Sequence, residues 1–200
     1  MPADDHSATV TPSTRIWLGR LAGDIDALDR AVSAAVRATP TPSLDAPLRS
    51  LSRAADSSKL WVGTALVIAA AGGPRGRRAA VAGLASVGVA SATVNLALKY
   101  GAVRPRPQRA AIDAGRDVPM PASTSFPSGH AASAFAFAVG TGNQLPVLAL
   151  PLNALAACVA YSRVHAAVHY PSDVVAGAAI GGAAGALISR LTRLRYGRGA

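Results

Sequence analysis

Charged, aromatic and sulfur-containing side chains are all scarce in this chain of 200 residues. Its single cysteine excludes an intramolecular disulfide and a cysteine-rich zinc site. Aromatic residues make up only 4% of the chain, too few for the usual base-stacking surface of a nucleic-acid-binding protein. Charged residues make up 15%, whereas a soluble domain carries about 25%. These shortages argue against a nucleic-acid partner and against an ordinary soluble domain.

Apolar residues are abundant instead, because half of the chain (50%) is hydrophobic and the mean hydropathy is +0.30. The 20 Lys and Arg residues outnumber the 10 Asp and Glu residues, which gives a net charge of +10. A basic and apolar chain suits a bilayer with anionic headgroups or an anionic substrate. We therefore predict a protein of the membrane.

The apolar residues form runs of helical length, which predicts an all-α fold: a polytopic transmembrane bundle of about five spans. One uncharged run of 20 residues is long enough to cross a hydrocarbon core of ~30 Å. The first and third runs are short enough to be buried core helices instead. The five runs are 60–73, 79–98, 131–140, 145–161 and 174–188.

The chain before residue 60 has a different pattern. Apolar residues recur at helical spacing over 15–37, but acidic residues interrupt them, so this segment is an amphipathic helix and a poor span. It either lies at the membrane surface or packs on the rest of the protein. We divide the chain into a polar and amphipathic N-terminus (1–59), a membrane domain (60–190) and a basic tail (191–200).

Small residues mark one face of the last apolar run. Gly177, Gly181 and Gly185 follow one another at intervals of four, a pattern that lets helices approach closely in lipid. The pattern favours tight packing within one bundle, and a homodimer through this face is the alternative.

Ionisable side chains beside membrane spans are costly and are therefore functional candidates. Lys99 ends a helix and precedes Arg104-Pro105-Arg106-Pro107; alone, this loop would be interpreted as a headgroup contact. Ser128, Gly129 and His130 lead directly into an apolar helix, where the N–H groups of a first turn favour an anion.

A third cluster places Arg163, His165, His169 and Asp173 within eleven positions. An aspartate that accepts a proton from His169 Nδ1 would leave Nε2 nucleophilic. Three metal ligands at His165, His169 and Asp173 are the alternative, but Pro171 interrupts the helix that would align them. Together the three clusters offer an anion cradle, a nucleophile and an acid, with no evident role for a metal.

These clusters resemble the signature of the type-2 phosphatidic acid phosphatase superfamily. That family includes lipid phosphate phosphatases, undecaprenyl pyrophosphate phosphatases and, more distantly, vanadium-dependent haloperoxidases. Its three motifs are K-x6-R-P, P-S-G-H and S-R-x5-H-x3-D, and the similarity covers about residues 60–190. The matching positions here are Lys99 with Arg106-Pro107, Pro127 to His130, and Ser162-Arg163 with His169 and Asp173.

The resemblance implies a role for each matched residue, with no cofactor and no metal. His169 would be the nucleophile that forms a phosphohistidine, Asp173 would orient it, and His130 would be the general acid. The phosphate would be bound by the residues Lys99, Arg106, Ser128, Gly129 and Arg163. Arg104 gives the wrong spacing and is expected at most beside the site or at a headgroup, and His165 lies outside the signature.

The resemblance also implies a location. Members usually have six spans and a site outside the cytoplasm, whereas here the first span is missing or replaced by the helix at 15–37. Arginines at 75–78 and 190–198 favour a cytoplasmic side for those segments. The Ala-, Gly- and Arg-rich composition resembles that of a bacterium with a GC-rich genome. We expect an integral protein of the bacterial inner membrane with an extracytoplasmic site, and an inverted orientation is the alternative.

The function expected from this resemblance is a metal-independent lipid phosphatase acting on a phosphomonoester or pyrophosphate of a prenyl lipid or glycerolipid. A lipid phosphotransferase with an alcohol acceptor is one alternative. A haloperoxidase is another, although soluble members of that group are much longer. No motif identifies the lipid.

Overall fold

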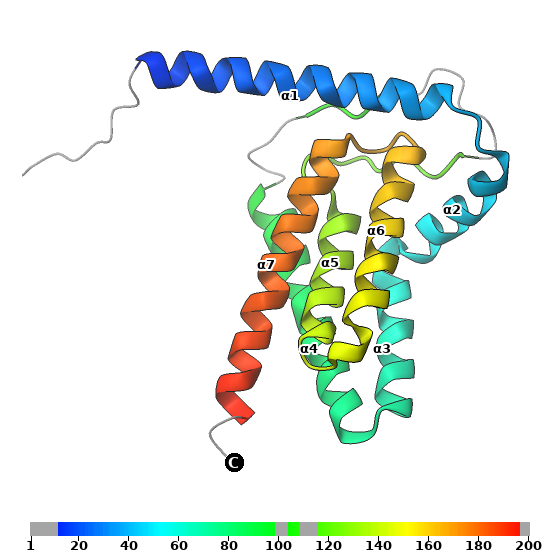
Figure 1. Ribbon diagram of the computed structural model, residues 1–200, viewed down its shortest axis with the longest axis vertical. Coiled ribbons are helices and arrows are strands. Elements are labelled where there is room, and N and C mark those ends of the chain that lie inside the picture. Colours follow the sequence, from blue (N-terminus) through cyan, green and yellow to red (C-terminus); the bar gives the residue numbers. More distant parts are fainter. Residues whose placement is uncertain (1–11, 99–103, 109–115, 197–200) are drawn as a thin grey trace, which may run out of the picture.

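Seven α-helices build the part of the chain that the computed structural model describes, residues 12–98, 104–108 and 116–196. Helices α3 to α7 run side by side as a bundle, and α1 (Pro12–Ala38) lies across one end of it (Figure 1). Helix α2 (Pro42–Ala54) and a short 3-10 turn, η1 (Asp56–Ser58), connect α1 to α3 (Lys59–Ala71). The predicted all-helical fold and the amphipathic helix near the N-terminus are confirmed.

The remaining elements follow the apolar runs. Helix α4 (Gly73–Ala92) continues into a π-helical segment, η2 (Thr93–Leu98). Helix α5 (Gly129–Gly142) and a 3-10 turn, η3 (Pro146–Leu148), precede α6 (Ala149–His165) and α7 (Pro171–Tyr196). Pro171 is the first residue of α7, where its missing N–H costs no hydrogen bond.

Helix α5 is the core of the bundle and packs against α4, α6 and α7. Ten of its 14 residues are buried. Five of these ten are alanine, so neighbouring helices approach closely. The largest buried side chain of α5, Phe137, contacts Trp61 of α3 with ring centroids 5.3 Å apart.

The glycine face of α7 supports this close packing. A Cβ atom at Gly177 would lie 2.4 Å from the Ser128 carbonyl oxygen, and one at Gly181 would lie 2.2 Å from that of Ala132. The interpretation as packing within one bundle is confirmed. Because α5 covers these glycines, they are not available as a homodimer face. A homodimer stays a prediction.

Three described helical stretches are long and apolar enough to cross a membrane: Gly73–Leu96, Pro146–His165 and Pro171–Arg195. Helices α3 and α5 have 13 and 14 residues. Each is therefore about 20 Å long at 1.5 Å per residue, shorter than a hydrocarbon core of ~30 Å. The chain is a membrane bundle, but the count of five spans is not confirmed.

Candidate active site

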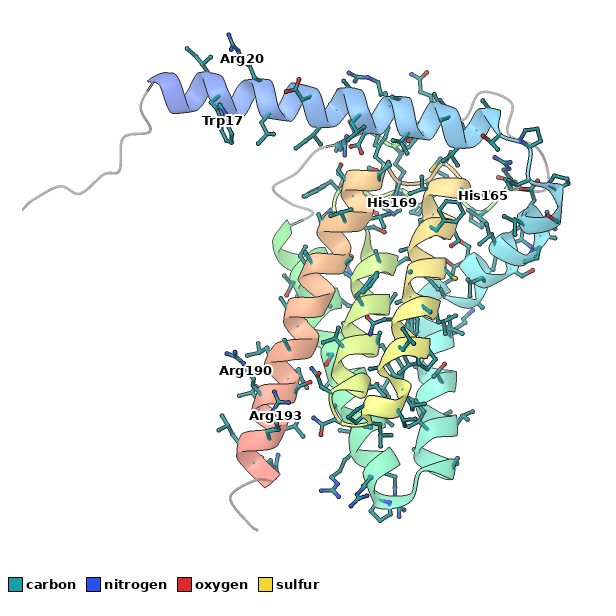
Figure 2. All side chains as sticks on the ribbon, viewed as in Figure 1. Trp17, Arg20, His165, His169, Arg190 and Arg193 are labelled. Atoms are coloured by element: carbon teal, nitrogen blue, oxygen red, sulfur yellow. The ribbon has the colours of Figure 1, made fainter. Side chains whose placement is uncertain are left out.

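The second and third motifs meet at the end of the bundle that α1 covers. Arg106 of the first motif and the neighbouring Arg104 lie at the same end. Figure 2 shows His165 and His169 at this end, whereas Arg190 and Arg193 lie toward the opposite end of α7. The start of α5, the turn between α6 and α7, and the loop residues 104–108 and 116–128 supply the site. Lys99 lies outside the described residues, so its predicted role in binding phosphate stays a prediction.

Asp173 is the buried anchor of the site. Its side chain has no exposed surface, although it sits in the first turn of α7. Its Oδ2 accepts hydrogen bonds from Ser125 Oγ at 2.5 Å and from the Tyr170 backbone N–H at 2.8 Å. Its Oδ1 accepts one from Arg104 Nη1 at 2.7 Å. The carboxylate is therefore fixed in position from three directions.

His169 lies between Asp173 and Arg106. Its Nδ1 is 3.7 Å from Asp173 Oδ2, beyond a normal hydrogen bond, and has no hydrogen-bond partner among the described residues. Its Nε2 is 3.4 Å from Arg106 Nη1. The ring thus has one nitrogen on the carboxylate side and the other beside a guanidinium, the arrangement needed by a nucleophile that attacks an anion.

Burial lowers the pKa of His169 below its usual value, and the positive charges of Arg106 and Arg163 lower this pKa further. Asp173 opposes the shift but does not cancel it. His169 is consequently neutral at pH 7, so one ring nitrogen carries a free lone pair.

Arg106 is held by the polypeptide backbone. Its Nη1 donates to the Val168 carbonyl at 2.7 Å, its Nη2 to the Thr124 carbonyl at 3.1 Å, and its Nε to the Ser123 carbonyl at 3.0 Å. Because these bonds already fix the guanidinium, its charge lies beside His169 Nε2 with no further loss of side-chain conformational freedom.

Arg163 is completely buried near the end of α6. Its carbonyl oxygen accepts the backbone N–H groups of Val168 and His169, which closes the turn that carries the predicted nucleophile. Its Nη1 donates to Ser52 Oγ on α2. One residue thus joins the third motif to the N-terminal part of the chain.

The start of α5 lies against the start of α7. The Ser128 N–H donates to the Asp173 carbonyl at 2.9 Å, while Ser128 Oγ caps the helix by accepting from the Ala131 N–H at 3.4 Å. The positive end of the α5 dipole, at Gly129 and His130, is therefore held beside His169 and Asp173, where an anion would be stabilised.

His130 has a partner that the motifs did not predict. Its Nε2 is 2.8 Å from Asp56 Oδ1, on the short turn between α2 and α3. Asp56 is also 4.0 Å from Arg163 Nη1. In the sequence, the break Asp56-Ser57-Ser58 before an apolar run was the available signal, but nothing there indicated a contact with position 130.

A second unpredicted contact comes from α1. Buried Asp29 accepts hydrogen bonds from the Ser172 N–H at 2.9 Å and from Arg104 Nη2 at 2.7 Å. Arg104, expected only beside the site, thus joins Asp29 to Asp173. The available signal was Asp29 itself, which shares a helix face with Ile25 and Val32 because they are spaced at i, i+4 and i+7.

His165 belongs to a separate cluster. Its Nε2 is 3.1 Å from Asp45 Oδ1 and 3.0 Å from Thr41 Oγ1, and Arg116 Nε donates to Asp45 at 2.9 Å. In the described part of the chain, no group of three or more His, Cys, Asp or Glu side chains is arranged to hold a metal ion. The alternative of three ligands at His165, His169 and Asp173 gains no support.

Comparison with known proteins supports the resemblance. The family model described as the PAP2 superfamily matches residues 79–196. The decaprenylphosphoryl-5-phosphoribose phosphatase of Mycobacterium tuberculosis is 39% identical over 74% of this chain and 80% of its own length. The protein of that name from Mycolicibacterium smegmatis is 37% identical over 76% of this chain and 80% of its own length.

Two solved structures share the fold. One is described as a transmembrane PAP2 type phosphatidylglycerolphosphate phosphatase from Bacillus subtilis. It has a TM-score of 0.68 and 22% identity, covering 86% of this chain and 87% of its own. The other, Aquifex aeolicus LpxE, has a TM-score of 0.64 and 23% identity, covering 82% and 95%.

Proposed function

Because the chain belongs to the PAP2 superfamily, we propose that this membrane phosphatase hydrolyses a lipid-linked phosphomonoester through a phosphohistidine, without a metal. The observation that carries the proposal is the placement of His169. Its Nε2 faces Arg106 and its Nδ1 faces the fixed carboxylate of Asp173. A neutral imidazole nitrogen beside the Arg106 guanidinium is placed to attack a phosphoryl group that this guanidinium binds.

In the first step, His169 Nε2 attacks the phosphoryl group. The N–P bond forms as the bond from phosphorus to the lipid headgroup oxygen breaks, and His130 donates a proton to that oxygen. Asp173 stabilises the positive charge that develops on His169. Arg106 and Arg163, the N-terminus of α5 and, from the motif, Lys99 stabilise the charge on the equatorial oxygens.

In the second step, water attacks the phosphohistidine. His130, now neutral, accepts a proton from this water as the new P–O bond forms and the N–P bond breaks. Inorganic phosphate leaves, and His169 and His130 return to their starting states. A histidine in each role needs no metal to supply the charge stabilisation, because the cations and helix N-terminus already surround the phosphoryl group.

The substrate that we propose carries a phosphomonoester on a prenylphosphoryl sugar. The supporting observation is the similarity to phosphatases named for decaprenylphosphoryl-5-phosphoribose, which extends over 80% of their length. The basic end of α7 would then lie in the cytoplasm and the site outside it.

Helix α1 suits a position in the outer interface. Figure 2 shows Trp17 on the side of α1 toward the bundle and Arg20 on the opposite side. Trp17 is 62% exposed although it is apolar, and α1 extends beyond the bundle at this end. A bilayer around the spans would cover such a side chain.

The test is phosphate release by the detergent-purified protein in EDTA from short-chain prenylphosphoryl phosphoribose, phosphatidic acid and phosphatidylglycerol phosphate. We expect release that survives EDTA, is lost in His169→Ala and persists in the control His165→Ala. Acid-labile, base-stable protein-bound phosphate should accumulate on rapid quenching. Activity that requires a divalent metal would overturn the proposed mechanism, and no release from any lipid would overturn the proposed function.

A further inference from the structure

A cavity of about 200 Å³ opens beside His130. Residues from the start of α5, the last turn of α4, the segment η2 and the turn η1 line it. In the proposed reaction, His130 donates its proton to the leaving oxygen. Whatever is attached to that oxygen must therefore lie against His130. Among the described residues, this cavity is a space that His130 itself lines and that the proposed mechanism has not yet used.

The lining of this cavity is polar for a site at the end of a membrane bundle. Besides His130, the lining includes four serines and one asparagine: Ser57, Ser58, Ser91, Ser133 and Asn95. Ser91 Oγ and Ser133 Oγ are 3.3 Å apart and link α4 to α5. Groups that both donate and accept hydrogen bonds suit a ligand with several hydroxyls, whereas an acyl chain would leave them unpaired.

Asp56 adds a carboxylate to this side of His130. It stands between the lining residues Ala55 and Ser57, and its Oδ1 contacts His130 Nε2. Ser57 and Ser58 both have positive φ angles, 53° and 61°. Residues other than glycine adopt this conformation rarely, and it is a recurrent feature of ligand-binding sites.

We infer that the cavity beside His130 binds the polyhydroxylated, sugar part of the leaving group, with Asp56 as an acceptor for its hydroxyls. This inference rests on the proposed phosphatase function and names the residues that would recognise the sugar of its substrate. The volume agrees, because pockets for drug-sized ligands measure roughly 300–1,000 Å³ and a single sugar ring is smaller. Asp56 then exchanges its contact with His130 Nε2 for a substrate hydroxyl, and Nε2 becomes available to the leaving oxygen.

The experiment compares two substrates of one enzyme, a short-chain prenylphosphoryl phosphoribose and phosphatidic acid. The measured quantity is the ratio of their kcat/KM values, since any general effect of a variant on His130 changes both substrates alike. The variants are Asp56→Asn and the near-isosteric Asn95→Leu. We expect each to lower the ratio about tenfold, the effect of losing one hydrogen bond to the sugar. Controls are Asp24→Asn on α1 and Asn153→Leu on α6, which should leave the ratio unchanged.

Equal losses on both substrates would overturn the inference, because Asp56 would then act only through His130. An unchanged ratio in Asn95→Leu, or a wild-type preference for phosphatidic acid, would overturn it as well. These failures are distinct from failure of the proposed function, in which the wild-type protein releases phosphate from neither lipid.

Discussion

The contact between Asp29 and the site predicts that α1 is part of the catalytic unit. Asp29 accepts hydrogen bonds from Arg104 Nη2, from the Ser172 N–H and from the Ser172 hydroxyl. Its side chain is 3% exposed. Replacement by alanine leaves Arg104 and the Ser172 N–H without these acceptors and removes the polar attachment of α1 to the start of α7.

The magnitude follows from these contacts. Losing one partner of a buried ion pair costs about 3–5 kcal/mol, and a hydrogen bond to a charged group contributes about 1.5–3 kcal/mol. Arg104 remains 21% exposed, so water compensates part of its loss. We expect Asp29→Ala to weaken the docking of α1 by about 2–3 kcal/mol, which is roughly a 30- to 150-fold change in the docking equilibrium.

Hydrogen–deuterium exchange of α1 in lipid nanodiscs measures this docking directly. Asp29→Ala should accelerate amide exchange in the C-terminal half of α1 and lower kcat, because Arg104, which binds Asp173, loses its short contact with α1. Asp29→Asn should lie between alanine and wild type, since an amide oxygen still accepts from Ser172. Exposed Asp24 on the same helix provides the control, Asp24→Ala. If the Asp29→Ala variant has the same amide exchange in α1 and the same kcat as this control, the proposed coupling of α1 to the site is refuted.

Three further perturbations test the packing, the chemistry and the orientation. Gly181→Ala should destabilise the bundle by about 1–3 kcal/mol, because the new Cβ atom would lie 2.2 Å from a carbonyl oxygen of α5. The control is Gly182→Ala, whose Cβ atom would have no neighbour within 4 Å, so the thermal midpoint should stay unchanged or rise. Because the pKa of His169 lies below its usual value, kcat/KM should fall at a lower pH than it would for a histidine of ordinary pKa, as His169 gains a proton. A profile that already falls above pH 7 would contradict this. Orientation is tested in intact cells with single-cysteine variants of a protein that otherwise lacks cysteine. A membrane-impermeant maleimide should label Ala122→Cys at the site end of the bundle but not Arg190→Cys at the other end. The reverse pattern would show that the site faces the cytoplasm.

Much of the site was predictable because its residues lie in short motifs. His169 and Asp173 are four positions apart, Ser128 to His130 are consecutive, and their helix boundaries follow from where the apolar runs begin. The structure brings these two motifs together through the bond from the Ser128 N–H to the Asp173 carbonyl. The catalytic roles of these residues stay predictions until variants are measured.

The residues missed by the sequence lie in the N-terminal segment. Ser52, Asp56 and Asp29 contact Arg163, His130 and Arg104 across 74 to 111 positions of the chain. The division at residue 59 therefore separates different hydropathy patterns, whereas the contacts of the site cross it. It stays a prediction as a domain boundary.

The sequence by itself determined the helical fold, the membrane environment and the motif residues, because hydropathy and spacing act over a few turns of helix. Only the tertiary structure decided which carboxylate meets which cation. Arg104 and Arg106 differ in sequence by two positions, yet one binds Asp29 and Asp173 while the other lies beside His169. The choice depends on how α1 crosses the end of the bundle, since ion pairs form between side chains that packing of distant helices brings within reach.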